Sequence, residues 1–243
     1  MTGDTPREVI ASLRRYLEEV RETGVEGLPL AAPAPSVSAA EASSASAVFG
    51  DARETLDDIR REMGGCHRCA LGAGRTNLVF GVGNPAARLM IIGEAPGRDE
   101  DLRGEPFVGE AGQLLTKIIE AMGFAREDVY ICNVLKCRTP HNRDPASAEI
   151  EACSSFMLRQ VKAVAPEAIL ALGTFAAQTI LGTKEPISRL RGRFHDYHGI
   201  PLMPTLHPAF LLRNPERKRD VWDDVRQVMG LLGKEVPGKG DRR

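Results

Sequence analysis

The sequence lacks the features that mark several classes of protein. Of its 243 residues only 5% are aromatic, with a single tryptophan, and the formal net charge at pH 7 is −1. Its apolar runs fall short of the roughly 18 residues that a membrane span needs, and its first residues lack the apolar stretch of an export signal. We therefore expect no membrane contact and a cytoplasmic location. The 42% of hydrophobic residues suffices for a full buried core.

The near-zero net charge hides an uneven distribution. Residues 1–64 contain 7 basic and 12 acidic side chains, whereas residues 65–243 contain 25 basic and 21 acidic ones. The mildly basic charge of residues 65–243, which follow an acidic N-terminal region, permits a nucleic-acid partner without requiring one.

Five cysteines in a chain without an export signal indicate a reducing compartment, and ligands rather than disulfides. Four of them follow an ordered pattern, with a Cys-x-x-Cys pair, Cys66 and Cys69, followed by Cys137 and Cys153. Four thiolates suit either a zinc ion or a [4Fe-4S] cluster, and the spacing leaves both open. Cys132 lies inside an apolar segment and is expected to be a buried core thiol.

Basic residues accompany the four cysteines. Arg68, Arg75 and Arg138 flank them in the sequence and suit an anionic centre. A thioredoxin-like redox role for the Cys66–Cys69 pair is an alternative, but the sequence around it does not predict the strand-to-helix setting that such motifs need.

The composition divides the chain into four parts. Residues 1–26 include a segment, 6–23, with apolar residues at helical spacing, and are expected to form a helical appendage. Residues 27–50 are rich in Pro, Ala and Ser and are expected to form a flexible linker. Residues 51–234 are expected to form the main domain, and residues 235–243 a disordered tail.

Within the main domain, short apolar segments alternate with amphipathic ones. Strands are expected over 89–92, 129–135 and 168–172, shorter β segments over 194–198 and 202–205, and helices over 112–122, 147–164, 175–181 and 219–232. This alternation predicts an α/β fold with a parallel sheet covered by helices on both faces. Because ligands of such sheets bind beyond the carboxyl ends of the strands, the loops after Ile92, Leu135 and Thr205 should carry function.

The segment after the first strand is a glycine-rich loop that is ill suited to phosphate. It runs from Gly93 to Gly97 and continues into the acidic residues Asp99, Glu100 and Asp101. A phosphate-binding loop needs Lys and Ser/Thr after its last glycine, and the carboxylates here would repel a pyrophosphate. We expect instead a neutral ring with a polar edge, stacked on Phe107.

Two further loops carry groups suited to such a ring. Asn133, in an otherwise apolar strand, offers an amide that can recognise a pyrimidine edge, although such an Asn alone more often bonds a neighbouring backbone group. His207 opens the segment HPAFLLRNP, in which the apolar residues 210–212 precede Arg213. Apolar wedges that enter the base stack, next to arginines that contact phosphate, are typical of base-flipping enzymes.

Five motifs now stand in a fixed order between Gly64 and Leu232: GEAPG, GEPFVGEAGQLL, NVLKC, the four-cysteine pattern and HPAFLLRNP. In this combination the chain resembles the iron–sulfur-containing (family 4) uracil-DNA glycosylases. The resemblance implies a three-layer α/β/α sandwich with a central, mostly parallel sheet, and a [4Fe-4S] cluster in place of zinc. It also implies hydrolysis of the N-glycosidic bond of a uracil flipped out of DNA, which leaves an abasic site and initiates base excision repair.

The resemblance also implies residue roles, carried over by motif. Glu94 matches the carboxylate that positions the attacking water, and His207 the histidine that hydrogen-bonds uracil O2. Glu100 matches the acidic residue that crowds carbon 5 of the ring and so disfavours thymine. Phe107 matches the aromatic residue that stacks on uracil, and Asn133 the amide that recognises its O4/N3 edge.

Three further sets complete these expectations. Gly93, in the GEAPG motif, is expected beside the substrate. The implied cluster ligands are Cys66, Cys69, Cys137 and Cys153, and the expected DNA contacts are Leu211, Arg213, Arg138 and Arg143. A related group of enzymes that bonds covalently to the abasic sugar carries a basic insertion after NVLKC; His141 does not match it, so we expect no covalent trapping.

The expected substrate is uracil-containing DNA, single- or double-stranded, and the chain is expected to act as a monomer in a bacterial or archaeal nucleoid. A replication or repair protein could bind through residues 1–50, which lie outside the resemblance. Three alternatives stay open. They are a related glycosylase that accepts other deaminated bases such as hypoxanthine, a non-catalytic iron–sulfur protein that binds single strands through Phe107 and the arginines, and a cluster-bearing redox sensor.

Overall fold

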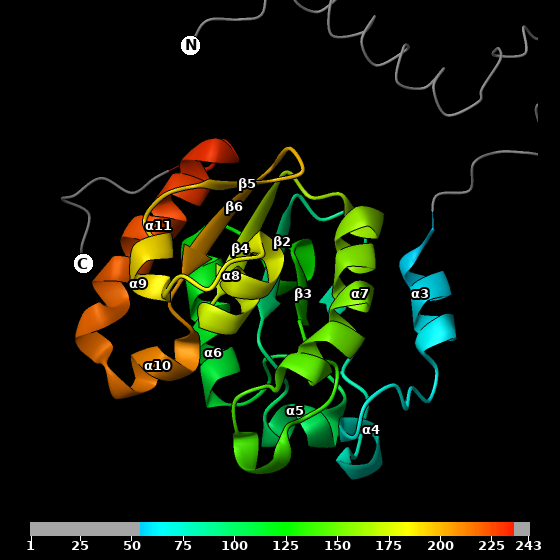
Figure 1. Ribbon diagram of the computed structural model, residues 1–243. Coiled ribbons are helices and arrows are strands. Elements are labelled where there is room, and N and C mark those ends of the chain that lie inside the picture. Colours follow the sequence, from blue (N-terminus) through cyan, green and yellow to red (C-terminus); the bar gives the residue numbers. More distant parts are fainter. Residues whose placement is uncertain (1–53, 236–243) are drawn as a thin grey trace, which may run out of the picture. The chain divides into compact units, whose positions relative to one another are not determined.

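The computed structural model describes residues 54–235 (Figure 1). The expected helix over 6–23, the expected linker over 27–50 and all but the first residue of the expected tail lie outside this range. No helix among the described residues has the length and apolar character needed to cross a membrane.

A six-stranded sheet forms the centre of the described part. Its strands lie in the order β1-β3-β2-β4-β6-β5. Their bounds are β1 Val82–Gly83, β2 Leu89–Gly93, β3 Tyr130–Asn133, β4 Ala168–Leu172, β5 His195–Tyr197 and β6 Ile200–Thr205. The four central strands, β3, β2, β4 and β6, pair in parallel, and the edge strands β1 and β5 pair antiparallel. The prediction of a mostly parallel sheet is confirmed.

The helices are α3 Leu56–Met63, α4 Leu71–Gly74, α5 Arg98–Arg103, α6 Glu110–Ala121, α7 Ser147–Val164, α8 Thr174–Leu181, α9 Ile187–Leu190, α10 Pro208–Arg213 and α11 Lys218–Leu231, with 3₁₀ turns at Arg126–Asp128, Pro140–Asn142 and Pro215–Arg217. The four helices expected from periodicity are confirmed to within two residues at each end. The expected strand over 129–135 is shorter at both ends, although the Val134 and Leu135 N–H groups still donate to the Gly93 and Glu94 carbonyls.

Two segments expected as loops are short helices, α5 and α10. Each begins with a side chain that satisfies a free backbone N–H at its start. In α5 the Glu100 carboxylate accepts from the Gly97 N–H at 3.1 Å. In α10 the His207 Nδ1 accepts from the Ala209 N–H at 3.1 Å, and Pro208 occupies the first helical position, which suits proline. Helices of six residues are too short to give a periodic apolar signal.

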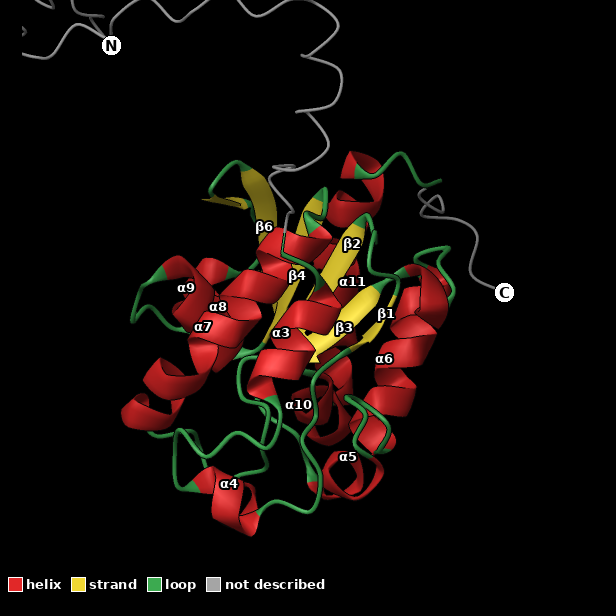
Figure 2. Ribbon diagram, turned by 90° about the vertical axis from the view of Figure 1, so that its right-hand side faces the viewer, coloured by secondary structure: helices red, strands yellow, loops and turns green. Residues whose placement is uncertain are grey.

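The sheet lies between two layers of helices (Figure 2). Because successive side chains of a strand point to opposite faces, Leu89 and Ile91 of β2 join one core with residues of α6, α10 and α11, whereas Met90 and Ile92 join the other with residues of α7, α8 and α9. The described residues therefore form the expected three-layer α/β/α sandwich. Cys132 is fully buried in the second core, so its prediction as a core thiol is confirmed.

Helix α3 lies outside the three layers and packs along α7 (Figure 1). Ile59 and Met63 of α3 form a small apolar cluster with Phe80 and with Phe156 of α7. This contact matters for the site because α3 leads directly into the Cys66–Cys69 segment.

A buried ion pair fixes the segment that leads to His207. The Asp224 carboxylate on α11 is 1% exposed and accepts from the Thr205 hydroxyl at 2.5 Å and from the Arg191 guanidinium at 2.9 and 3.0 Å. Thr205 ends β6, two residues before His207. The three side chains thereby hold β6, α9 and α11 together at the carboxyl edge of the sheet.

Removing Arg191 should therefore destabilise the fold strongly. Arg191→Met leaves a buried carboxylate without its cation, which typically costs about 3 kcal/mol or more of unfolding free energy, measured by urea unfolding of the purified protein. Arg61→Met is the control, because Arg61 pairs with Asp58 at an exposed site, and it should cause no measurable loss. Equal stability of the two variants would contradict the role of the buried pair.

Candidate functional site

A cavity of about 390 Å³ opens at the carboxyl edge of the parallel strands. It receives residues from all three loops that the sequence analysis singled out, those after β2, β3 and β6. Its lining residues are Glu94, Ala95, Pro96, Gly97, Glu100, Phe107, Ala111, Asn133, Thr139, Asn142, Asp144, His207, Ala209, Phe210 and Arg213. A larger hollow of about 630 Å³, beside α7 and the β5–β6 turn, contains none of the predicted site residues.

The register of β2 and β3 places Gly93 beside Asn133, which lines the cavity. Gly93 and Asn133 are directly paired across the two strands. A Cβ atom on Gly93 would lie 2.4 Å from the Asn133 Oδ1 and 2.5 Å from the Phe107 Cζ, so only glycine fits between these side chains. The Asn133 side chain is buried, at 1% exposure, and its Oδ1 has no hydrogen-bond partner. Because an unsatisfied buried acceptor is costly, this oxygen favours a ligand that donates to it.

Phe107 is held in an uncommon backbone conformation. Its φ is +53°, in the left-handed region that non-glycine residues rarely adopt. The Arg126 guanidinium donates to the Pro106 and Phe107 carbonyls at 2.7 and 2.9 Å and so stabilises the turn. Gly112, in the first turn of α6, permits the close approach, since a Cβ there would lie 2.0 Å from the Phe107 carbonyl.

His207 faces Phe107 across the cavity, with ring centroids 5.6 Å apart and planes inclined by 32°. Burial lowers the pKa of His207 to about 4, against the opposing charge of Glu100, and Arg213 adds to the lowering. The ring is therefore neutral at pH 7. Since its Nδ1 accepts from the Ala209 N–H, the proton is on Nε2, which makes Nε2 a hydrogen-bond donor.

The ionisation of Glu94, a lining residue of the cavity, is shifted toward neutral pH. Burial raises its pKa to about 7, and the negative charge of Asp144, another lining residue, adds to the effect. A carboxyl group with such a pKa in a cavity is a candidate acid–base or water-positioning group.

Glu100 has a structural task in addition to the one expected. Its carboxylate accepts from the backbone N–H groups of Gly97, Val108 and Gly109 at 3.1, 2.9 and 2.9 Å. These bonds join the start of α5 to the segment that carries Phe107. Glu100 also lines the cavity, and its expected action against carbon 5 of a ring stays a prediction.

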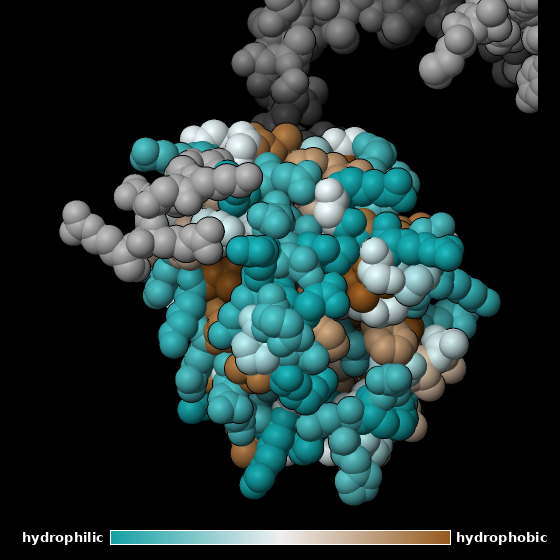
Figure 3. All heavy atoms as spheres, turned by 90° about the vertical axis from the view of Figure 1, so that its left-hand side faces the viewer, coloured by the Kyte–Doolittle hydropathy of each residue, from teal (hydrophilic) through white to brown (hydrophobic). Residues whose placement is uncertain are grey.

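The expected DNA contact of Leu211 is wrong. Leu211 is fully buried and packs in the core with residues of α6 and α11, because α10 turns it inward. Its neighbour Leu212 points outward and is 42% exposed; in the described part of the chain, only Leu102 and Leu231 are equally large apolar residues with exposed side chains. The side of the molecule on which α10 and α11 lie is mainly hydrophilic, with small separate apolar areas (Figure 3).

The three arginines expected at DNA differ in their surroundings. Arg213 lines the cavity, and its charge contributes to the low pKa of His207. Arg138 donates to the Asn142 side chain at 2.8 Å. Arg143 forms a two-point pair with Glu149 at 2.6 and 2.9 Å, which places its guanidinium against the start of α7. Arg213 thus lines the cavity, whereas Arg143 is engaged within the protein.

The four cysteines expected as ligands come from three segments that converge beside the cavity loops. Burial raises the pKa of Cys137, and Cys69 and Cys66 add to the effect. Burial also raises the pKa of Cys153 to about 11, with smaller contributions from Cys137 and Cys69. Among residues 54–235, no three His, Cys, Asp or Glu side chains lie close enough to hold a single metal ion. All four cysteines have free thiols, and this donor set fits a cluster with four thiolate ligands.

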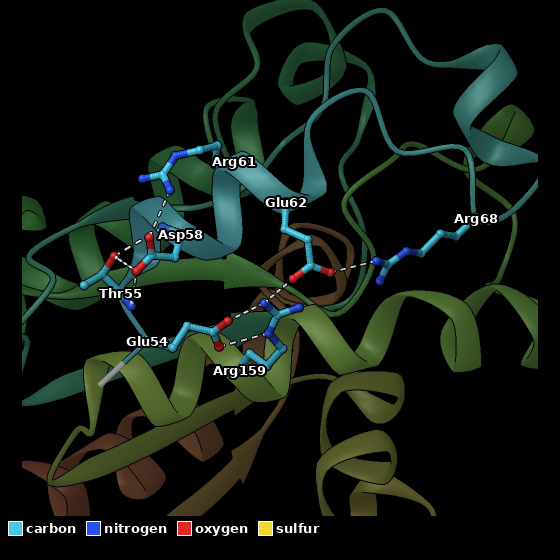
Figure 4. A network of polar contacts seen from close by, with 7 residues as sticks. All are labelled: Glu54, Thr55, Asp58, Arg61, Glu62, Arg68 and Arg159. Carbon is cyan, nitrogen blue, oxygen red and sulfur yellow. Dashed lines mark hydrogen bonds and ion pairs between the residues drawn. The ribbon is translucent and has the colours of Figure 1, made fainter. Parts of the chain in front are cut away.

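Of the flanking arginines, only Arg75 contacts a cysteine sulfur in the structure. Its Nη1 donates to the Cys137 Sγ at 3.3 Å and to the Cys66 carbonyl at 2.6 Å. Arg68 turns away, donates to Glu62 of α3 at 2.8 Å and lies over the Phe156 ring. Glu62 also bonds to Arg159 of α7 (Figure 4), so this network fastens the Cys66–Cys69 segment to the helix that carries Cys153.

Sequence reasoning missed several cavity residues. Thr139, Asn142 and Asp144 come from the segment after Cys137, whose sequence carries no recognisable motif. Arg126 was also missed, because nothing in its local sequence shows that it reaches the carbonyls of residues about twenty positions earlier. In the segment after Cys137, the only local signal is a proline next to polar residues, and this pattern indicates a turn rather than a binding site.

Comparison with known proteins agrees with this arrangement. Residues 80–226 match the family model described as the Uracil DNA glycosylase superfamily. A type-4 uracil-DNA glycosylase of Archaeoglobus fulgidus is 45% identical over 192 residues, which cover 76% of this chain and 96% of the relative. A type-4 uracil-DNA glycosylase of Thermotoga maritima is 42% identical, and the match covers 75% of this chain and 97% of the relative. A type-5 uracil-DNA glycosylase of Pyrobaculum aerophilum is 35% identical, and the match covers 56% of this chain and 67% of the relative. The chain belongs to the uracil-DNA glycosylase superfamily.

Proposed function

We propose that this protein is a uracil-DNA glycosylase, which binds a uracil flipped out of DNA and hydrolyses its N-glycosidic bond to leave an abasic site. Membership of the superfamily supports this activity, as does similarity to type-4 enzymes over most of the chain. The observation that carries the proposal is the cavity in which Phe107, Asn133, His207 and Glu94 meet.

The cavity suits a flat ring with a donor and acceptor on its edge. Phe107 supplies an aromatic face, and the unpartnered Asn133 Oδ1 supplies an acceptor for the N3–H of uracil. The Asn133 amide group then donates to the adjacent O4. A cytosine ring presents the opposite polarity at both positions, so Asn133 discriminates between the two pyrimidines.

His207 is suited to stabilise the departing base. Cleavage of the bond leaves negative charge on uracil, and a neutral imidazole with its proton on Nε2 can donate to O2 as that charge develops. The low pKa keeps the ring neutral. The bond to the Ala209 N–H holds it in the required tautomer and orientation before the substrate arrives.

Glu94 is suited to the sugar side of the reaction. In its ionised form it would hold the attacking water and favour positive charge on the sugar ring, as carboxylates do in glycosidases. Its raised pKa means that only part of the population is ionised at neutral pH. Asp144 therefore influences the reaction through the charge of Glu94.

We also propose that Cys66, Cys69, Cys137 and Cys153 bind a [4Fe-4S] cluster. Such a cluster would cross-link the three segments that carry its ligands and could exchange electrons, but hydrolysis of a glycosidic bond transfers none. The chemistry of base release is accordingly assigned to Glu94 and His207.

For DNA contact we assign Arg213 to a phosphate and Leu212, in place of Leu211, to the base stack. Roles for Arg138 and Arg143 at phosphate, and action as a monomer, stay predictions.

The direct test is incubation with a single-stranded oligonucleotide that contains one deoxyuridine, scored for base release and strand cleavage at the abasic site. Thymine, hypoxanthine and xanthine oligonucleotides are the parallel substrates. Release of uracil alone supports the proposal, and additional release of hypoxanthine would place the protein among glycosylases of broader specificity. Failure to release uracil from any oligonucleotide, by iron-loaded protein, would overturn it.

Replacing His207 should impair catalysis rather than binding. His207→Ala removes the donor to O2, and loss of one such preorganised donor typically lowers the rate by on the order of 10²-fold. Single-turnover rates on deoxyuridine DNA measure this loss, and binding to abasic DNA, which has no base to stabilise, should change little. A parallel loss in both measurements would refute the assignment.

The rate should rise with pH through the ionisation of Glu94. Because its pKa is raised to about 7 and the ionised form is active, kcat/KM should fall about tenfold per unit below that value and level off above it. His207 stays neutral throughout, since its pKa is lowered to about 4.

Two variants test the origin of this profile. Asp144→Asn removes a charge that raises the Glu94 pKa, so the midpoint should move to lower pH; Glu94→Gln should abolish the inflection. Asp223→Asn, an exposed position on α11, is the control and should leave the profile unchanged. A midpoint that does not move in Asp144→Asn would exclude the proposed coupling.

Leu212 should matter for duplex DNA in particular. Leu212→Ala removes an exposed apolar side chain beside the cavity, and we expect excision from duplex DNA to fall about tenfold or more, since unstacking a base costs a few kcal/mol. Single-stranded substrate, which needs no wedge, should be affected much less. Leu231→Ala, exposed at the end of α11, is the matched control. Identical losses on both substrates would argue against a wedge.

A further inference from the structure

The turn after Cys137 has an uncommon backbone conformation. His141 and Asn142 follow each other in the chain, and both have a φ of +54°, in the left-handed region that non-glycine residues rarely adopt. The Arg143 N–H donates to the Pro140 carbonyl at 3.1 Å, so the two residues form the centre of a four-residue turn. Turns of this kind favour glycine and asparagine. The backbone by itself would therefore accept glycine at position 142 as readily as asparagine.

Other side chains anchor this turn. The Thr139 hydroxyl donates to the Arg143 carbonyl at 2.6 Å. The Arg143 guanidinium forms its two-point pair with Glu149 at the start of α7. These bonds fix the end of the turn without using the Asn142 side chain.

Asn142 lies at the mouth of the candidate cavity. Among the residues that line this cavity, only Asn142, Asp144 and Arg213 are exposed, whereas the residues assigned to the base, Phe107 and Asn133, are buried. A nucleotide whose base reaches the buried end would leave its sugar and the adjacent phosphates near the exposed residues. Asn142 is therefore placed to contact the DNA backbone rather than the base.

The amide of Asn142 is oriented by Arg138. The Arg138 Nε donates to the Asn142 Oδ1 at 2.8 Å. Because a guanidinium has no acceptor, this contact identifies the oxygen side of the amide. The Nδ2 on the other side donates to no residue in the described part of the chain. The charge of Arg138 polarises the amide and so strengthens Nδ2 as a donor.

We propose that the Asn142 Nδ2 donates to a phosphate next to the flipped nucleotide, and that Arg138 positions the amide for this contact. The inference rests on the proposed function, because it assumes a uracil nucleotide in the cavity. Contacts from asparagine to phosphate are common in protein–DNA complexes, where they fix the position of the backbone. The negative charge of Asp144 acts against an anion at the mouth, whereas the Arg138 and Arg213 guanidinium groups favour one.

Two glycine variants separate the amide from the turn. Asn142→Gly and His141→Gly each replace a left-handed residue, but only Asn142 lines the cavity. Both variants should unfold in urea close to the wild-type midpoint or above it. Binding to a single-stranded oligonucleotide with a tetrahydrofuran abasic site, which needs no catalysis, should weaken about tenfold in Asn142→Gly, as is typical for loss of a hydrogen bond to a charged group. His141→Gly should bind as the wild type does, and equal affinities of the two variants would overturn the proposal.

Modified oligonucleotides identify the group that Asn142 binds. A neutral methylphosphonate replaces the phosphate on the 5′ side or on the 3′ side of the abasic site, one at a time. At one of these positions the replacement should weaken binding by the wild type and by His141→Gly about tenfold. Asn142→Gly has already lost the donor, so the same replacement should change its affinity little. If Asn142→Gly responds to both replacements as the wild type does, Asn142 does not bind a phosphate.

An aspartate pair keeps the test decisive if Asn142→Gly does not fold. Asn142→Asp keeps the size of the side chain and an acceptor for Arg138, but it replaces the donor with a negative charge. It should weaken binding to the abasic oligonucleotide at least about tenfold. His141→Asp adds the same charge at the neighbouring position and should weaken binding much less. Equal weakening by the two aspartates would show an effect of charge alone and contradict the contact.

A double variant tests the positioning role of Arg138. Arg138→Met leaves the Asn142 amide without its orienting donor, so binding to the abasic oligonucleotide should weaken. The double variant Arg138→Met/Asn142→Gly should bind no more weakly than Asn142→Gly alone, because both changes remove the same contact. Additive losses would show that Arg138 acts independently of Asn142.

Failure of this inference is distinguishable from failure of the proposed function. Protein that binds the abasic oligonucleotide through Asn142 but leaves uracil in DNA would refute the glycosylase activity and leave the phosphate contact valid. Protein that releases uracil, with the same affinity for abasic DNA in every Asn142 variant, would refute the phosphate contact alone.

Discussion

The parallel pairing of β2 with β3 is the constraint on which the site depends. It sets Gly93 beside Asn133, and it continues past the ends of both strands, because the Val134 and Leu135 N–H groups donate to the Gly93 and Glu94 carbonyls at 2.9 Å. The carboxylate assigned to the sugar side and the amide assigned to the base edge are thereby fixed relative to each other by backbone bonds. A slip of one residue in this register would turn one of them away from the cavity.

Burial shifts the pKa values of the two groups assigned to the reaction in opposite directions, and in both cases it favours the neutral form. Desolvation disfavours charge, so it lowers the pKa of His207 and raises that of Glu94. A neutral histidine is what an N–H donor to a departing anion requires, whereas a carboxyl group near its midpoint can be tuned by Asp144. Removal of water would strengthen the proposed hydrogen bond to uracil. The same removal of water raises the pKa of Glu94, so that its charge changes near neutral pH.

The sequence predicted every strand except β1, and the three loops that line the cavity, because their signals are local: apolar runs, glycine turns and a Cys-x-x-Cys pair. The sequence did not predict which side of a helix is buried, or contacts between residues that are far apart in the chain. Leu211 and Leu212 are indistinguishable in sequence, and only the packing of α10 on α6 decides which one is buried. Arg143 was expected at DNA but pairs with Glu149, and Asp144 enters the cavity from a segment without a motif.

Residues 133–137 contain both the residue assigned to base recognition, Asn133, and a proposed cluster ligand, Cys137. Hydrolysis by itself does not require these two roles to lie in one segment. Asn133 lines the cavity, Cys137 is one of the four proposed cluster ligands, and the Lys136 Nζ donates to the Asn133 carbonyl. The Cys66–Cys69 segment is fastened to α7 because Arg68 bonds to Glu62, which in turn bonds to Arg159 of α7. In the proposed function, base recognition and cluster binding therefore depend on one short segment of the chain.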